Sequence, residues 1–460
     1  MSSSLRALNR FGLGARPGEA DRLGDPRGWL LGQLAGAPPA RSVPAGAASA
    51  EIEASLSAFR RLQRSEDRAA RAAARRRLVL IAVAESASTL EMRATSERPF
   101  AERLIAFWGD HLCVSVGSRL LVGPLAGSYE RDVIRANALG TFEAMVLASA
   151  RHPAMLVYLD NAQSVGPRSQ AAQRASGRRE LGLNENYARE LLELHTLGVG
   201  GGYTQADVTE LARLLTGWTT DGIAARGVPA FRFVAIRNEP GRKTILGERY
   251  GEGEREGERA IRAFCRHPAT AKHIATKLAT HFVADTPPAS AVARLEQVFR
   301  ESGGDLRELA RALVALPECW DERNVKFRAP QDWLVAVMRA AGARQAGENL
   351  LNVLRQLRQP MWSPQSPKGF GDLQREWADP DSLLNRAELA RTIARRAGNA
   401  APGAARGMAA RGVGISAAAP RALATVVPDD AALAALLADD EIPAAERAAI
   451  AFASPAFQWR

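Results

Sequence analysis

Lysine and cysteine are both scarce in this chain of 460 residues. Only five of the 61 basic residues are lysine, and the rest are arginine. The net charge of +11 therefore reflects a bias toward arginine. Alanine is also abundant, and we attribute both biases to codon usage. The three cysteines, Cys113, Cys265 and Cys319, lie far apart without a CxxC pair, which excludes a disulfide framework and a zinc ribbon.

Long apolar runs are also missing from the chain. No stretch approaches the roughly 18 apolar residues that a transmembrane helix needs, and the first residues lack the apolar segment of a secretory signal. We therefore expect no membrane span and a cytoplasmic protein, with export expected only if the N-terminus is incomplete. The hydrophobic content of 46% is that of a globular protein with a sizeable core.

Five arginines recur at intervals of three or four positions, which predicts a basic face on one helix. They are Arg60, Arg64, Arg68, Arg71 and Arg75. A solvated face, partly paired with Glu66 and Asp67, is the preferred interpretation over a polyanion-binding stripe. The run lacks the interleaved aromatic residues on which nucleic-acid bases stack, so we expect no nucleic-acid partner.

Hydrophobic residues follow a helical period along most of the chain. Proline- and glycine-rich stretches divide it into an N-terminal helix and linker (1–50), a helical core (51–396), and an Ala/Gly/Pro-rich linker with C-terminal helices (397–460). A strand-like stretch near 231–247 predicts one β-hairpin. The strand–helix alternation of a Rossmann sheet is absent. We predict an all-α, multi-helix globular protein with one minor β-hairpin.

Residues 184–218 carry more reactive side chains than any other stretch. Their pattern predicts two helices joined by a glycine-rich turn, and Thr204 and Asp207 have the spacing of a capping box at the start of the second helix. One face of the first helix carries Asn186, Arg189, Glu190 and Glu193. At a rise of about 1.5 Å per residue, Glu190 and Glu193 lie level with acidic residues of the second helix.

Three interpretations of these carboxylates stay open. They form a structural network neutralised by Arg189 and Arg213, they act in catalysis or ligand binding, or they hold a hard cation. The Glu-x-x-His spacing of di-iron bundles is absent, because His195 follows Glu193 by two positions, and we assign no metal ligand. In a catalytic site, Glu190 or Glu193 would be the general acid or base, tuned by Arg189.

Two other regions carry candidate residues. His111 lies on the apolar face of a helix that Pro99 opens, and it is either a buried, hydrogen-bonded histidine or a second proton carrier. The irregular segment 361–386 either lines a carbohydrate- or anion-binding wall or is anchored on the core by its tryptophans. The candidate substrate-binding residues are Asn186, His195, Asp207, Trp218, Lys243, Trp362, Lys368, Trp377 and Arg386. No HExxH, GxSxG, Walker or GxGxxG motif is present in its proper context, so the cofactor stays unknown.

Several longer motifs run from one end of the chain to the other. They are LNRFGLGARPGE, FWGDHL, HPAMLVYLDN, the 184–218 segment, KTILG, HPATAKHIATKLATHFVADTPP, MWSPQSPKGF and ASPAFQWR. In these motifs the chain resembles the bacterial proteins grouped as domain of unknown function 1800. The resemblance implies a helical protein, often encoded beside an exported alkaline-phosphatase-like partner, and it implies no reaction. Relatives tend to carry His-Asp where this chain has Asn238 and Glu239, which implies an altered member if that histidine is essential.

Two functions follow from these observations. In the first, the protein is an enzyme whose cleft lies between the 184–218 segment, the His111 helix and the 361–386 loop, and it uses carboxylate acid–base chemistry on a polar, glycan-like substrate. In the second, the same residues hold the helices in register, and the protein is a non-catalytic binding or assembly partner of an alkaline-phosphatase-like enzyme.

Overall fold

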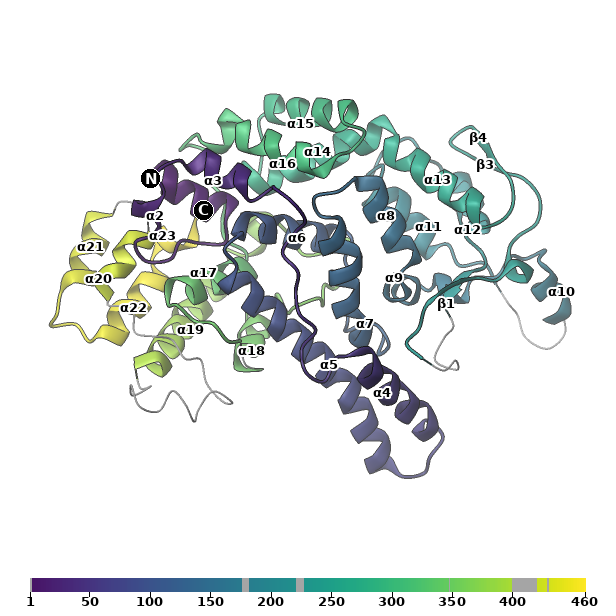
Figure 1. The fold of residues 1–460 in the computed structure, drawn as a ribbon, viewed down its shortest axis with the longest axis horizontal. Coiled ribbons are helices and arrows are strands. Elements are labelled where there is room, and N and C mark those ends of the chain that lie inside the picture. The colour runs from purple at the N-terminus through teal and green to yellow at the C-terminus, as the bar shows by residue number, and fades with distance from the viewer. Residues whose placement is uncertain (1, 176–181, 221–226, 347, 399–419, 428–429) are drawn as a thin grey trace.

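The computed structural model describes residues 2–175, 182–220, 227–346, 348–398, 420–427 and 430–460, and these residues are mostly helical (Figure 1). This confirms the predicted fold class. The helices of the first half are α1 (Ser3–Arg6), α2 (Glu19–Arg22), α3 (Pro26–Gly32), α4 (Ser49–Leu62), α5 (Arg68–Thr95), α6 (Pro99–His111), α7 (Gly123–Ser128), α8 (Phe142–Arg151), α9 (Pro153–Tyr158), α10 (Gln170–Ala175), α11 (Asn186–Glu190) and α12 (Gln205–Leu214).

The second half of the chain contains helices α13 to α23. The first half also contains three π-helical turns. The helices are α13 (Glu254–Arg266), α14 (Pro268–Phe282), α15 (Ala289–Glu301), α16 (Leu306–Ala315), α17 (Pro330–Ala340), α18 (Glu348–Gln356), α19 (Pro380–Gly398), α20 (Pro420–Leu423), α21 (Ala431–Ala438), α22 (Ala444–Ala453) and α23 (Pro455–Gln458). The π-helical turns are η1 (Ala7–Phe11), η2 (Tyr129–Arg135) and η4 (Leu191–His195). The last of these directly continues α11.

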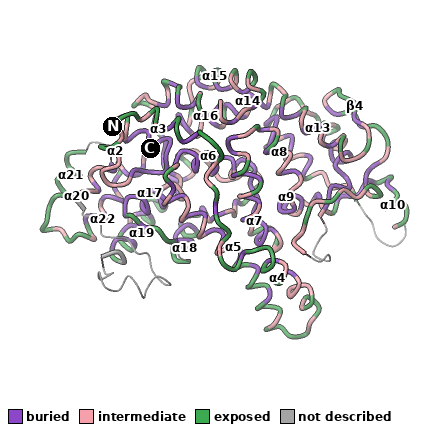
Figure 2. Tube along the Cα trace, viewed as in Figure 1, coloured by how far each residue is buried: buried purple, intermediate pink, exposed green. Residues whose placement is uncertain are grey.

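Buried side chains form two large hydrophobic clusters, and Figure 2 marks the buried residues along the chain. The first, here called the large core, is built from α6–α9 and α11–α16. The second core is built from α17–α22 together with residues 5–15 and the end of α5. The second core thus joins residues from both ends of the chain, across the boundaries of the predicted three-part division, which stays a prediction. Most of the 397–427 linker lies outside the described residues.

Helices α4 and α5 form an arm that projects from the rest of the molecule (Figure 1). The two helices are separated by a break after Leu62, and the side chain of Asp67 accepts the N–H of Ala70 to cap α5. The prediction that the five arginines share one helix face is therefore wrong, because Arg64 lies in the turn. The serine, aspartate and glutamate around position 66 favour this turn over a continuous helix.

The strands pair differently from the predicted single hairpin. Strand β1 (Trp218–Thr220) pairs with β2 (Phe231–Phe233), and β3 (Lys243–Ile245) pairs with β4 (Glu248–Tyr250), both antiparallel. The turn between β3 and β4 is Leu246-Gly247, with φ of 51° and 80°. A two-residue turn with both φ values positive suits the twist of a hairpin, but leucine is unusual there. Asp207 holds this turn, because its carboxylate accepts the N–H of Leu246 at 2.6 Å.

A buried ionic network anchors the middle of the fold. Glu102 of α6 is fully buried and forms two hydrogen bonds, of 2.6 and 2.9 Å, with the guanidinium of Arg135. Arg135 also contacts Glu130, which in turn pairs with Arg41. Arg41 belongs to the stretch that the sequence identified as a linker, so that stretch is fastened to α6 and η2. The network fixes the position of α6, which forms one wall of the site described next.

Candidate functional site

A cavity of about 410 Å³ lies at the border between the large core and the second core. Its walls are α6, α14, the last turn of α5, the first turn of α17 and the segment 359–376. Ligand pockets have volumes of roughly 300–1,000 Å³ and often lie at such borders. The charged and polar lining residues include Arg93, Arg103, Asp110, His111, Lys277, His281, Gln331, Asp332, Gln359, Lys368, Asp372 and Arg375.

Helices α6 and α14 line the cavity as an antiparallel pair. Lys277 of α14 contacts His111 near the end of α6, and His281, one turn later on α14, packs against Phe107, one turn earlier on α6. The cavity therefore has two ends. One end holds Asp110, His111 and Lys277. The other end holds Arg103, at the start of α6, and the first turn of α17.

Asp110 is the carboxylate of the first end. Its Oδ1 accepts the backbone N–H of Phe370 at 2.8 Å. Burial raises the pKa of Asp110 to about 7, although the hydrogen bond from Phe370 and the nearby Lys277 act in the opposite direction. Gly369 permits this contact, because it has a φ of +87° and a Cβ there would lie 2.5 Å from the backbone oxygen of Asp110. A carboxyl group that titrates near neutrality can both donate and accept a proton.

His111 and Lys277 form a hydrogen-bonded pair beside Asp110. The Nε2 of His111 lies 3.1 Å from the carbonyl oxygen of His195 and must donate to it, so its Nδ1 is an acceptor. Lys277 Nζ donates to this Nδ1 at 3.0 Å. Burial, together with the charge of Lys277, holds the pKa of His111 well below its ordinary value. Burial also lowers the pKa of Lys277, while Asp110 acts to raise it. The imidazole is therefore neutral and orients the ammonium.

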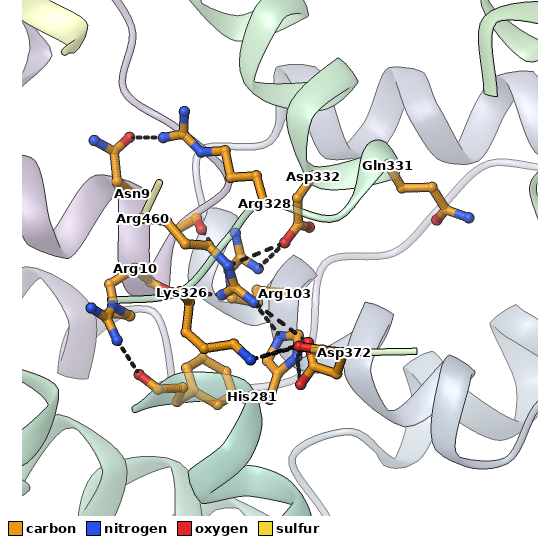
Figure 3. A network of polar contacts seen from close by, with 12 residues as sticks. Asn9, Arg10, Arg103, His281, Lys326, Arg328, Gln331, Asp332, Asp372 and Arg460 are labelled. Atoms are coloured by element: carbon orange, nitrogen blue, oxygen red, sulfur yellow. Dashed lines mark hydrogen bonds and ion pairs between the residues drawn. The ribbon is translucent and has the colours of Figure 1, made fainter. Parts of the chain in front are cut away.

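The middle of the cavity is bordered by a histidine–aspartate pair. His281 Nδ1 lies 3.1 Å from Asp372 Oδ2, and Arg460 NH2 lies 3.5 Å from the opposite ring nitrogen (Figure 3). Burial acts to raise the pKa of Asp372, but its contacts with His281, Lys326 and Arg460 lower it to about 2. Asp372 is thus an anion at neutral pH, and it fixes the proton of His281 on Nδ1.

The second end is held by arginines and one aspartate. Asp332 accepts from Arg103 at 2.8 Å and lies 3.4 Å from Arg460 (Figure 3). Arg103 also donates to the carbonyl of Gly12, and Arg10 donates to the carbonyl of Phe282. These contacts tie η1, α6, α14 and α17 to one another behind the cavity wall.

The carboxylates of the 184–218 segment lie elsewhere. The cavity lining includes neither Glu190 nor Glu193. Glu190 is half-buried, and burial followed by the charge of Glu193 raises its pKa. Glu193 accepts the hydroxyl of Tyr203 at 3.1 Å, and Arg189 pairs with Glu185 at 3.3 Å. His195 contacts the lining residue His111 through both its carbonyl and its ring. Whether the carboxylates of this segment act in catalysis stays a prediction.

Other candidates of that segment have structural contacts. Asp207 closes the predicted capping box with Thr204, which is confirmed, and it also holds the β3–β4 turn. The amide of Asn186 lies 3.5 Å from the carbonyl of Leu159. Trp218 is fully buried, in contact with Phe231.

The candidates after position 240 divide into two groups. Lys368 lines the cavity, as does His111, and neither Lys368 nor Arg375 has a hydrogen bond or ion pair within the described residues. The others hold the fold together. Lys243 is buried and donates to two backbone carbonyls, Trp377 donates to the carbonyl of Gly371 at 2.9 Å, and Arg386 stacks on Phe327 at 4.7 Å. Trp362 is half-buried and packs against both cores.

Asn238 and Glu239, where the chain departs from its relatives, are also engaged in packing contacts. The amide of Asn238 donates to the carbonyl of Thr216 at 2.8 Å and accepts the N–H of Gly253 at 3.0 Å. Glu239 accepts from both the backbone and the guanidinium of Arg168. Asn238 therefore joins the residues that precede β1 to those that follow β4, and Glu239 joins the segment just before α10.

The sequence reasoning missed Asp110, Lys277, His281, Asp372 and Arg93. The signal for two of them was present, because Lys277 and His281 are four positions apart and share one face of a helix. Asp372 lies in the irregular segment 361–386 that the sequence singled out, but no pattern distinguishes it from its neighbours there, and Arg93 lies in a helical stretch without a distinguishing pattern. Within the described ranges, no group of three or more His, Cys, Asp or Glu side chains is placed to hold a metal ion, and no helix is long and apolar enough to cross a bilayer.

The fold and the cavity define a helical protein with a ligand-sized site whose charged side chains come from five separate segments. The family described as "Protein of unknown function (DUF1800)" matches residues 6–459, and the chain belongs to this family. The resemblance seen in the sequence motifs is thereby confirmed. No curated protein and no solved structure gives a significant match to the chain.

Proposed function

We propose that this protein is an enzyme that transfers a proton to or from a small polar substrate bound in the cavity, with Asp110 as the general acid or base. One observation carries the proposal. A carboxyl group with a pKa of about 7 lines a ligand-sized cavity beside the half-buried Lys277. Strongly shifted pKa values in a cleft are typical of catalytic groups, which work best near the operating pH.

Lys277 and His111, the neighbours of Asp110, support the proton transfer in this proposal. Lys277 makes one hydrogen bond within the described residues, to His111, so two of its three N–H donors remain for a negative charge that develops on the substrate. His111 orients Lys277 and is itself held by the carbonyl of His195. In this proposal His111 therefore acts as a positioning residue, and not as the second proton carrier that was one of its two interpretations from the sequence.

The substrate combines polar and apolar parts. Phe107 and Phe370 line the same cavity as Asp110 and Lys277, and an aromatic surface beside polar groups suits a sugar ring or another compact hydroxylated molecule. The carboxylate acid–base chemistry expected from the sequence is retained, but we assign it to Asp110. Glu190 lies outside this cavity, and within the described residues no hydrogen bond or ion pair orients its carboxylate.

The test is a screen of chromogenic glycosides and esters with the purified protein, followed by pH–rate profiles. We expect kcat/KM to change with an apparent pKa near 7, and we expect Asp110→Asn to abolish turnover while Glu190→Gln retains it. If Asp110→Asn retains turnover and Glu190→Gln loses it, the catalytic carboxylate belongs to the 184–218 segment instead. If no compound is turned over and a pull-down recovers an alkaline-phosphatase-like protein, the binding-partner function is favoured instead.

A further inference from the structure

The second end of the cavity contains a buried arginine that lacks an anionic partner. Arg93, in the last turn of α5, is 7% exposed and lines the cavity. Its NH1 donates to the neutral amide oxygen of Gln331 at 3.0 Å. Its Nε has no hydrogen-bond partner, and none of the carboxylates in the described ranges forms an ion pair with it. The other arginine at this end, Arg103, is paired with Asp332.

A guanidinium withdrawn from water without an anion is unfavourable for the fold. The edge of Arg93 formed by Nε and NH2 carries no acceptor, and this edge has the fork geometry that a carboxylate fits with two parallel hydrogen bonds. Burial also lowers the pKa of Arg93, although the charges of Glu130, Glu102 and Asp332 act to raise it.

A second donor without an acceptor lies beside it. Gln331 and Gln359 are joined by two hydrogen bonds, one from the backbone N–H of Gln331 to Gln359 Oε1 at 2.8 Å and one from Gln331 Nε2 to the carbonyl of Gln359 at 3.3 Å. The Nε2 of Gln359 makes no hydrogen bond within the described part of the chain, and Gln359 lines the cavity. Arg93 and Gln359 thus offer only hydrogen-bond donors to a ligand in the cavity.

The cavity rim favours the entry of an anion. Lys368 and Arg375 are both exposed at the cavity, and neither is paired within the described residues. The carboxylates of Asp285 and Glu376 also line the cavity, but both accept backbone N–H groups of the 373–374 turn. Unpaired cations around a low-dielectric opening raise the local concentration of negatively charged ligands. The charge at the rim and the donors at the second end therefore select for the same kind of ligand.

We infer that Arg93 and Gln359 form a subsite for a carboxylate group of the ligand. In combination with the proposed function, on which this part rests, the substrate is an extended carboxylic acid whose reacting group lies at Asp110. Arg103, which lies at the same end of the cavity as Arg93, is seven residues from Asp110 on α6, and this corresponds to about 10 Å between the two ends. A carboxylate several bonds away from the reacting atoms fits this separation.

The experiment measures binding of glutarate by calorimetry, with inorganic phosphate and the neutral glutaramide as comparison probes. We expect glutarate to bind the wild-type protein and Asp110→Asn, and glutaramide not to bind. Arg93→Gln removes the charge, and Arg93→Lys keeps the charge but removes the fork, so both should weaken glutarate binding by at least about tenfold. Arg294→Gln, an exposed arginine on α15, is the matched control and should bind glutarate unchanged.

Several results would overturn the carboxylate subsite. They are unchanged glutarate binding in Arg93→Gln, equal binding of glutaramide, or binding of phosphate without glutarate. If Arg93→Gln does not fold, Arg93→Lys and Gln359→Met provide the same comparison. Because glutarate binding is measured in Asp110→Asn as well, loss of the subsite is distinguished from failure of the proposed chemistry, which alone depends on the carboxyl group of Asp110.

Discussion

Replacing Asp110 by asparagine should make the protein more stable at neutral and alkaline pH. The folded protein raises the pKa of this carboxyl from its ordinary value of 3.8 to about 7. The folded state therefore binds the proton more tightly than the unfolded state does. This contribution to stability is fully present below the unfolded pKa and is lost as the pH rises through the folded pKa. Asparagine has no proton to lose, so the variant escapes this loss.

The size of the effect follows from the pKa difference. One pKa unit corresponds to about 1.4 kcal/mol, so the shift to about 7 corresponds to a loss of about 4 kcal/mol once the pH is above both values. The hydrogen bond from the N–H of Phe370 is retained in the variant, because the amide oxygen of asparagine accepts it as Oδ1 of Asp110 does. The gain of the variant should therefore be small at pH near 4 and about 3 to 4 kcal/mol near pH 8.

The assay is urea unfolding followed by tryptophan fluorescence for wild type and Asp110→Asn across this pH range. Asp381→Asn, an exposed aspartate at the start of α19, is the control, and its unfolding curves should follow those of the wild type at every pH. A difference between Asp110→Asn and wild type that stays constant with pH would refute the reasoning, because it would mean that folding does not change the proton affinity of Asp110.

Two further changes test the supports of the site. Glu102→Gln should lower the free energy of unfolding by about 3–5 kcal/mol, because it leaves the buried Arg135 without its main anionic partner. Glu308→Gln, which changes an exposed side chain, should alter the free energy of unfolding by less than about 1 kcal/mol. Equal effects of the two substitutions in urea unfolding would contradict a structural role of the network. Gly369→Ala should be destabilised by more than Gly303→Ala, because both glycines have a positive φ but only at Gly369 does the added Cβ approach a backbone oxygen at 2.5 Å. Equal unfolding midpoints for the two alanine variants would show that the loop moves freely away from Asp110.

The local signals of the sequence predicted the helices well. Pro99 opens α6, and Thr204 with Asp207 caps α12, because each effect depends on residues within one turn. The β-hairpins were harder, because the partner of Phe231–Phe233 lies upstream and the β3–β4 turn uses Leu246-Gly247. That leucine adopts a positive φ with the help of a hydrogen bond from its N–H to Asp207, a contact that no local pattern reveals.

The candidate site was harder to predict than the fold, for a physical reason. Reactive side chains that are neighbours in sequence, as in 184–218, are easily noticed, but Lys277 and His111 meet across 166 positions. Moreover, a pKa near neutrality results from burial, which the type of a residue does not show. Asp110 is the neighbour of His111, which the sequence did identify as a candidate. The burial of Asp110 in a cavity depends on the packing of α14 and the 368–376 segment against α6, which the sequence does not show.

The contact between Arg460 and Arg10 has a consequence for the synthesis of the protein. Arg460 NH1 lies 3.4 Å from the carbonyl oxygen of Arg10, across 450 positions, and the same side chain reaches Asp332 and Asp372. At about 5–20 residues per second, a ribosome needs tens of seconds to synthesise the chain between the two arginines. Until Arg460 is synthesised, the carbonyl of Arg10 lacks this donor, and Asp332 and Asp372 lack one of their cationic neighbours. The contacts of Arg460 with Arg10, Asp332 and Asp372 can therefore form only after translation has reached Arg460, and products truncated before it should lack these contacts.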